Sequence, residues 1–134
     1  MTFSYMQEPV YILVVDDEAE LANLFREFLN SVGYNTVSFT NPVLALENFK
    51  NNPNRFYIII TDLRMPGISG IDFANRIREL NDKVTVFLMT AFDIIDVQHN
   101  PRYQSANFKG IIQKPIKLSD LKFMIEQTIQ NSQG

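Results

Sequence analysis

Three aspartates, a threonine and a lysine could bring nucleophilic and metal-binding chemistry to one place in this 134-residue chain. Each stands at the end of an apolar run, and together they are Asp16, Asp17, Asp62, Thr90 and Lys114. Three carboxylates that meet would repel one another and raise the pKa of at least one of them, so they require a positive counter-charge. A hard divalent ion meets that need, and oxygen-only ligands favour Mg²⁺ over a softer metal.

These side chains suit phosphoryl transfer. Mg²⁺ could orient a phosphorylated donor, and Asp62 could attack its phosphorus as a carboxylate nucleophile. Lys114 and the metal ion would neutralise charge on the transferred group, while the Thr90 hydroxyl would donate a hydrogen bond to one of its oxygens. The residues therefore predict that Asp62 accepts a phosphoryl group, with Thr90 and Lys114 assisting.

Short apolar runs precede most of these polar residues and predict buried strands. The predicted strands are Tyr11–Val15, Asn35–Phe39, Phe56–Ile60, Val84–Met89 and Gly110–Gln113. Helical periodicity between them implies right-handed crossovers and an open parallel sheet with helices on both faces. Because such sheets bind ligands beyond the carboxyl ends of their strands, the polar residues at four of these ends should lie together.

The segments between the strands carry apolar side chains at helical spacing. Their stripes are, in chain order, Leu21, Leu24, Phe25, Phe28, Leu29 and Val32; Val43, Leu46 and Phe49; Phe73, Ala74 and Ile77; and Leu121, Met124, Ile125 and Ile129. Gly33 is expected to close the first helix, and Asn41 with Pro42 to begin the second. Residues 92–109 show little periodicity and contain Asn100-Pro101, so we expect the fourth helix to be short, displaced or partly unwound.

Composition limits the class of protein. With 46% hydrophobic and 20% charged residues, the chain has the balance of one globular domain, expected over 1–134 with a core at about 10–131. The net charge of -3 argues against direct binding of nucleic acid, which depends on clustered Lys and Arg. The absence of cysteine, of a signal peptide in MTFSYMQEP and of a long apolar run predicts a cytoplasmic protein without a membrane segment.

Four motifs, in order and each at a strand end, resemble the receiver domain of two-component response regulators. The motifs are Val15-Asp16-Asp17-Glu18, the DLRMPGISG run from Asp62 to Gly70, Thr90-Ala91 and Lys114-Pro115. Each fragment alone is weak, but the set covers nearly the whole chain. The resemblance implies an α/β fold: a flavodoxin-like three-layer sandwich with a five-stranded parallel sheet of order 2-1-3-4-5.

The resemblance also implies a role for each acidic residue. Asp62 becomes the phosphoacceptor. Asp17, Asp62 and the backbone carbonyl of Arg64 are expected to bind Mg²⁺ directly, and Asp16 through water. An isolated acidic pair such as Asp16-Asp17 could merely cap a helix, but the additional presence of Asp62 and Lys114 favours the metal site.

Other positions would serve switching in this family. Thr90 would move toward the phosphoryl group in the active state, Ala91 would leave room for it, and Lys114 would contact the phosphate. The Lys114-Pro115 peptide is expected to be cis. Ile111 departs from the family, which usually has an aromatic residue there, so the usual aromatic rotamer switch should be absent or altered.

Arg64 and Phe92 lie two residues beyond Asp62 and Thr90, where family side chains flank the path of the hydrolytic water. We expect Phe92 to shield the phosphoryl group in part and lengthen its lifetime. The single histidine, His99, is interpreted as a solvated loop residue.

The first functional hypothesis is a receiver that takes phosphate from a sensor histidine kinase or phosphotransfer protein. Such a receiver would catalyse its own phosphorylation and dephosphorylation without being a conventional turnover enzyme. Conformational switching would then signal to a downstream protein or produce a homodimer. The alternative is a receiver-like docking module that works without phosphorylation, which the departures at Ile111 and in the fourth-helix region would suit. A phosphatase with an aspartyl intermediate needs a second acid–base carboxylate, and Arg64 stands in its place.

Overall fold

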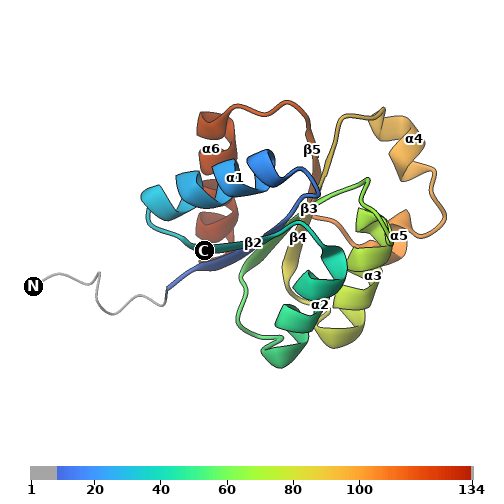
Figure 1. The fold of residues 1–134 in the computed structure, drawn as a ribbon, viewed down its shortest axis with the longest axis horizontal. Coiled ribbons are helices and arrows are strands. Elements are labelled where there is room, and N and C mark those ends of the chain that lie inside the picture. The colour runs from blue at the N-terminus through green and yellow to red at the C-terminus, as the bar shows by residue number, and fades with distance from the viewer. Residues whose placement is uncertain (1–8, 134) are drawn as a thin grey trace, which may run out of the picture.

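A computed structural model of the protein describes residues 9–133. The expected absence of a signal peptide concerns residues 1–8, which lie outside the described residues. The elements in chain order are β1 (Tyr11–Val15), α1 (Ala19–Ser31), β2 (Asn35–Phe39), α2 (Pro42–Asn51), β3 (Ile58–Asp62), α3 (Gly70–Leu80), β4 (Thr85–Thr90), α4 (Ile94–Gln98), α5 (Tyr103–Ala106), β5 (Gly110–Gln113) and α6 (Leu118–Gln133). Strands and helices alternate as predicted (Figure 1).

The five strands form one parallel sheet of order β2-β1-β3-β4-β5. This arrangement confirms the predicted flavodoxin-like fold. β3 begins and ends two residues later than expected, because Ile12 of β1 pairs with Ile58. Phe56 is still buried, before the strand begins, where its ring stacks on Phe49 at 6.2 Å between centroids.

Each face of the sheet is covered by its own apolar cluster. On one face α1 and α6 contribute Phe25, Leu29, Leu121 and Ile125. On the other face α2, α3 and α5 contribute Phe49, Phe73, Ile77 and Ala106, among others. Figure 1 shows the same division, with α1 and α6 on one side of the strands and α2, α3 and α5 on the other. Both faces of the sheet are therefore covered by helices, and its carboxyl edge is held between two packed layers.

The ends of the first two helices follow the sequence signals. Gly33 takes a φ of 106° after α1, and the Asn41 side chain accepts the Val43 backbone N–H at 2.8 Å at the start of α2. The predicted apolar stripes included Leu24 and Val43, and this prediction was wrong, because the two residues are 45% and 47% exposed. The smaller Ala22 and Ala45 take the inward positions instead.

The segment between β4 and β5 contains two short helices. α4 has five residues, and α5 has four. The Asn75 amide of α3 donates to the Arg102 carbonyl, and the Ser105 hydroxyl donates to the Asn75 carbonyl oxygen at 2.6 Å. Arg78 donates to the carbonyls of Ala106 and Asn107, each at 2.8 Å. α5 is thus fixed to α3 by polar contacts. The expectation of a short fourth helix agrees with the five residues of α4.

Within residues 9–133, no helix combines the length and the apolar character needed to cross a bilayer.

Candidate functional site

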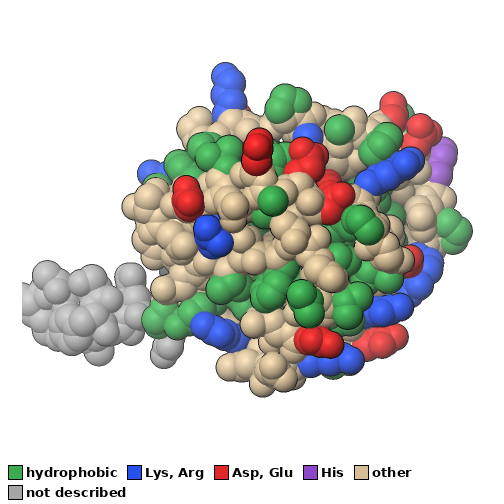
Figure 2. Space-filling view, viewed as in Figure 1, with side chains coloured by type: hydrophobic (Ala, Val, Ile, Leu, Met, Phe, Trp, Pro, Cys, Tyr) green, Lys and Arg blue, Asp and Glu red, His purple; other side chains and the backbone are tan. Residues whose placement is uncertain are grey.

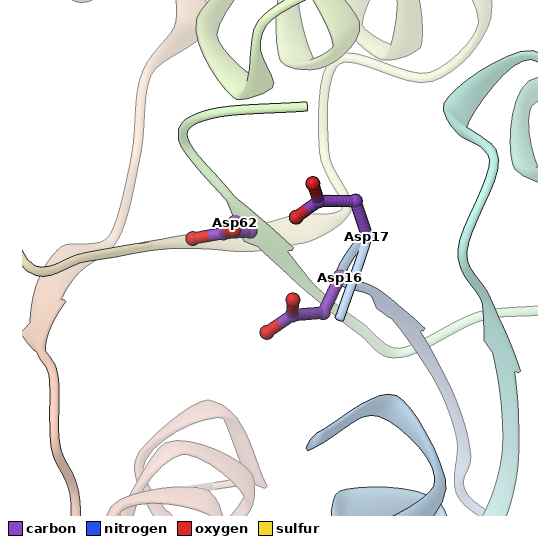
Figure 3. A group of neighbouring side chains, drawn as sticks. All are labelled: Asp16, Asp17 and Asp62. Carbon is purple, nitrogen blue, oxygen red and sulfur yellow. The ribbon is translucent and has the colours of Figure 1, made fainter. Parts of the chain in front are cut away.

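Three carboxylates meet at the carboxyl edge of the sheet. Asp16 and Asp17 follow β1, and Asp62 is the last residue of β3, next to β1 in the sheet. One oxygen from each lies within 4.8 Å of the others. Figure 3 shows the three side chains directed into the same space beyond the strand ends, and Figure 2 shows acidic side chains gathered over this edge. The structure therefore brings together the acidic residues that the sequence singled out.

Lys114 is the cation of this group. Its ammonium nitrogen lies 3.0 Å from Asp16 Oδ2 and 3.3 Å from Asp62 Oδ1, and a weaker contact of 3.8 Å reaches Glu18. Asp16 is fully buried, and the Asp62 side chain is only 10% exposed. Screening by water is weak at such depth, so the charges in this pocket influence one another strongly.

The balance of charge in the pocket is negative. Burial and then the charge of Asp16 raise the pKa of Asp62 to about 6, although Lys114 and the Leu63 backbone N–H oppose the rise. Burial lowers the pKa of Lys114, but its hydrogen bond to Asp16 and the charges of Asp16 and Asp62 outweigh burial and raise it overall. One ammonium thus does not compensate three carboxylates. The donor set consists of carboxylate oxygens and has surplus negative charge, which fits a hard divalent cation such as Mg²⁺.

The Asp62 backbone is fixed by a close approach of α3. Gly70, the first residue of α3, donates its N–H to the Leu63 carbonyl at 2.7 Å, and Leu63 donates to the Met89 carbonyl at 2.9 Å. A Cβ on Gly70 would overlap the Asp62 carbonyl oxygen and lie 3.0 Å from Leu88 Cδ1. Sequence reasoning placed Gly70 only in a loop motif, whereas the structure makes it a constraint on the position of Asp62.

Thr90 ends β4, the strand beside β3, and is 1% exposed. Its hydroxyl oxygen accepts the Phe92 N–H at 2.9 Å. Within residues 9–133 the hydroxyl donates no hydrogen bond, so its proton is available to a further acceptor. The expected movement of Thr90 toward a phosphoryl group stays a prediction.

Arg64 and Phe92 form a pair beside the acidic pocket. The guanidinium carbon of Arg64 lies 4.3 Å from the centroid of the Phe92 ring, a cation–π contact. Both residues and Asp17 line a groove of about 660 Å³ between the loop after β3 and α4. The sequence placed both side chains near the pocket but did not predict their direct contact.

The remaining residues named from the sequence lie around this pocket. Ala91 is exposed, and Ile111 is partly buried against the apolar cluster of Ile71, Leu88 and Val97. The Lys114-Pro115 peptide is cis, as the resemblance implied. His99 is exposed at the end of α4, as expected of a solvated residue.

Replacing Asp62 with Asn is expected to stabilise the metal-free protein. Because Asp62 has a raised pKa, the folded protein holds a proton between pH 3.8 and about 6 that the unfolded chain has lost. Stability should therefore fall as pH rises through this window, and the loss should persist above it. At neutral pH in EDTA, the Asn variant should gain about 1–2 kcal/mol in free energy of unfolding and show a flatter pH profile.

Denaturant unfolding between pH 4 and 8 measures this effect. Glu79→Gln removes an exposed carboxylate from α3 and is the matched control, expected to change little. An Asp62→Asn variant less stable than the wild-type protein at neutral pH would contradict the surplus of negative charge in the pocket.

Comparison with known proteins agrees with this fold and site. The family model of the response regulator receiver domain matches residues 12–126, and the chain therefore belongs to the response regulator receiver family. It is 27% identical over 118 residues to the response regulator receiver protein CpdR of Brucella abortus, covering 88% of this chain and 95% of that protein. The sporulation initiation phosphotransferase F of Bacillus subtilis is 31% identical over 87 residues, covering 64% of this chain and 68% of that protein.

Solved structures share the architecture. The response regulator TrrA of Thermotoga maritima, determined in complex with Mg²⁺ and BeF, is 28% identical, with a TM-score of 0.75 over 89% of this chain and 98% of that one. Some relatives are longer: the chain spans only 31% of the cyclic di-GMP phosphodiesterase of Thermotoga maritima. The likeness to that enzyme concerns only the part that this chain spans.

Proposed function

We propose that this receiver accepts a phosphoryl group on Asp62 and changes conformation to signal to a partner protein. The observation that carries the proposal is the position of the Asp62 carboxylate, 3.3 Å from the Lys114 ammonium and grouped with Asp16 and Asp17 at the carboxyl edge of the sheet. A nucleophilic carboxylate with a cation beside it and further acidic ligands around it is suited to phosphoryl transfer.

The reaction follows from the residues present. An Asp62 oxygen forms a bond to phosphorus while the bond from phosphorus to the donor's leaving group breaks, and water later cleaves the aspartyl phosphate to restore the carboxylate. Lys114 stabilises charge on the phosphoryl oxygens, and the Thr90 hydroxyl donates to one of them. Asp17, Asp62 and the Arg64 carbonyl would hold Mg²⁺ directly, and Asp16 through water. The bound ion would supply charge neutralisation and orientation of the donor.

The relatives support the choice of metal and partners. TrrA was determined with Mg²⁺ and BeF, and one relative is named a phosphotransferase. Another relative is the sensor protein EvgS of Escherichia coli, 29% identical over 127 residues, of which this chain spans 10%. We infer that the donor is a histidine kinase or phosphotransfer protein in the cytoplasm and that the output is a protein contact, with a partner or a second copy. A docking module that needs no phosphorylation is not favoured, since the acidic pocket and its lysine are complete.

A small-molecule phosphodonor tests the proposal directly. Acetyl phosphate with Mg²⁺ should add the mass of one phosphoryl group to the intact protein, and EDTA should prevent the gain. Asp62→Asn should abolish the gain. Asp82→Asn, which replaces an exposed aspartate shortly before β4 begins, should leave it unchanged. No gain in the wild-type protein, or a gain that survives Asp62→Asn, would favour the docking module.

Phe92 is expected to slow the loss of the phosphoryl group. Its ring lies under Arg64 in the groove that Asp17 also lines, and we expect it to restrict the approach of water to Asp62. Phe92→Asn should shorten the half-life of the phosphoprotein about threefold to thirtyfold, as expected when a water-excluding side chain is removed. Loss of phosphate after removal of the donor, followed by intact mass, measures the rate. An unchanged half-life would show that Phe92 does not shield the group.

A further inference from the structure

Gln113 contacts the loop after β4 but has no role in the site described so far. It is the last residue of β5 and lies opposite Thr90, the last residue of β4. Its side-chain nitrogen lies 3.0 Å from the Thr90 carbonyl oxygen and 3.2 Å from the Phe92 carbonyl oxygen. The Lys114 backbone N–H also donates to the Thr90 carbonyl at 2.8 Å. One amide group therefore spans two carbonyls of the segment 90–92.

Beyond Thr90, which is buried at the end of β4, this segment has little apolar burial to hold it. Phe92 is 46% exposed, and Ala91 is exposed. The turn is closed by the Phe92 N–H, which donates to the Thr90 hydroxyl oxygen, and the Phe92 ring contacts Arg64. Polar contacts thus decide the conformation of this segment. Gln113 supplies two of these contacts from the neighbouring strand β5.

These contacts connect the edge of the sheet to the groove beside the pocket. Gln113 holds the Phe92 backbone, the Phe92 ring lies against Arg64, and both side chains line the groove together with Asp17. A change at Gln113 can therefore move a wall of the groove although Gln113 does not line it.

We propose that Gln113 is a positioning residue: its amide holds residues 90–92 in the conformation that places the Phe92 ring against Arg64. The consequence for the aspartyl phosphate rests on the proposed function, because a displaced Phe92 would admit water to Asp62. Both partners of the side chain are carbonyl acceptors, so only a donor satisfies them. A negatively charged carboxylate at this position would be repelled by the two carbonyl oxygens.

Two length-matched variants separate the donor from the side-chain bulk. Gln113→Met removes the donor without adding charge, and Gln113→Glu replaces the donor with an acceptor. Gln104→Glu, at an exposed position of α5, introduces the same charge outside the segment 90–92 and is the control. Because Gln113 is exposed, all three variants should fold, which thermal unfolding would verify.

The first measurement uses unphosphorylated protein without metal. The Arg64 Nε–H resonance should lose the ring-current shift that Phe92 imposes, and the Phe92 amide should exchange with solvent about threefold to tenfold faster in both Gln113 variants, as expected for the loss of one or two neutral hydrogen bonds. The control should match the wild-type protein. Unchanged Arg64 and Phe92 signals in both variants would overturn the proposal, as would an effect in Gln113→Glu alone, which would indicate charge rather than lost donation.

The second measurement is the half-life of the phosphoprotein, which should shorten about threefold to tenfold in both variants. An unchanged half-life together with a displaced Phe92 would overturn the role of Gln113 in retaining the phosphoryl group. If the wild-type protein takes up no phosphate, the proposed function fails, while the resonance and exchange measurements still decide whether Gln113 positions the segment.

Discussion

Replacing Lys114 with Met is expected to reduce the rate of phosphorylation about a hundredfold or more, the size of effect seen when a charged group that stabilises a transition state is removed. Among residues 9–133, Lys114 is the only basic side chain paired with Asp16 or Asp62. Without it, the phosphoryl oxygens would meet an acidic pocket with no ammonium. Initial rates with acetyl phosphate and Mg²⁺, followed by intact mass, measure the loss.

The same substitution should destabilise the metal-free protein. Asp16 is fully buried, and breaking a buried ion pair by removing one partner costs about 3–5 kcal/mol. Mg²⁺ should raise the melting temperature of this variant more than that of the wild-type protein, because the ion restores the missing positive charge. Lys117→Met, at an exposed position three residues away, is the control. A Lys114→Met variant with wild-type stability and a rate within twofold would contradict the assigned role.

Gly70→Ala is the second substitution with a large expected effect. In most helices Ala is more favourable than Gly by about 1 kcal/mol, so a stabilising result would be the ordinary expectation. Here the new Cβ would overlap the Asp62 carbonyl oxygen, and overpacking of this kind costs about 1–3 kcal/mol or more. The Asp62 backbone would have to move, and phosphorylation should slow at least about tenfold, since small displacements of a reacting group lower rates strongly.

Gly110→Ala provides a matched control. A Cβ there would find the Phe87 ring at 3.7 Å, an ordinary van der Waals distance. This variant should keep wild-type stability and phosphorylation. Thermal unfolding and the phosphorylation rate of both variants test the contrast, and equal behaviour of Gly70→Ala and Gly110→Ala would show that the approach of α3 to Asp62 does not matter.

The sheet could be predicted from the sequence because buried parallel strands have a strong local signal. β1 is continuously apolar and is followed by Asp16, and the turn residues Gly33 and Asn41 mark the neighbouring helices. The meeting of Asp16, Asp17 and Asp62 followed from one rule, that the carboxyl ends of parallel strands share an edge. Family membership was predicted from motifs at those ends, and the match of the family model to residues 12–126 confirmed it.

Contacts that depend on tertiary placement were not predicted. Asn75 and Arg78 look like solvent-facing positions of a helix, yet they hold α5 by hydrogen bonds across 27 to 29 residues of chain. Gln113 looks like an ordinary exposed strand end, and nothing local indicates that its amide reaches Phe92. Gly70 reads as a loop glycine until α3 is placed against Asp62. Sequence patterns thus identified which residues form the pocket, while the residues that hold it in place emerged only from the structure.

The central claim is that the phosphoryl group is carried by Asp62, and chemical trapping tests it most directly. Borohydride reduces an aspartyl phosphate to homoserine, so protein treated with acetyl phosphate and Mg²⁺ and then reduced should yield one modified peptide after digestion. The account predicts homoserine at position 62 and at no other aspartate, with none formed in EDTA. Unmodified Asp62, or homoserine at Asp16 or Asp17, would contradict it.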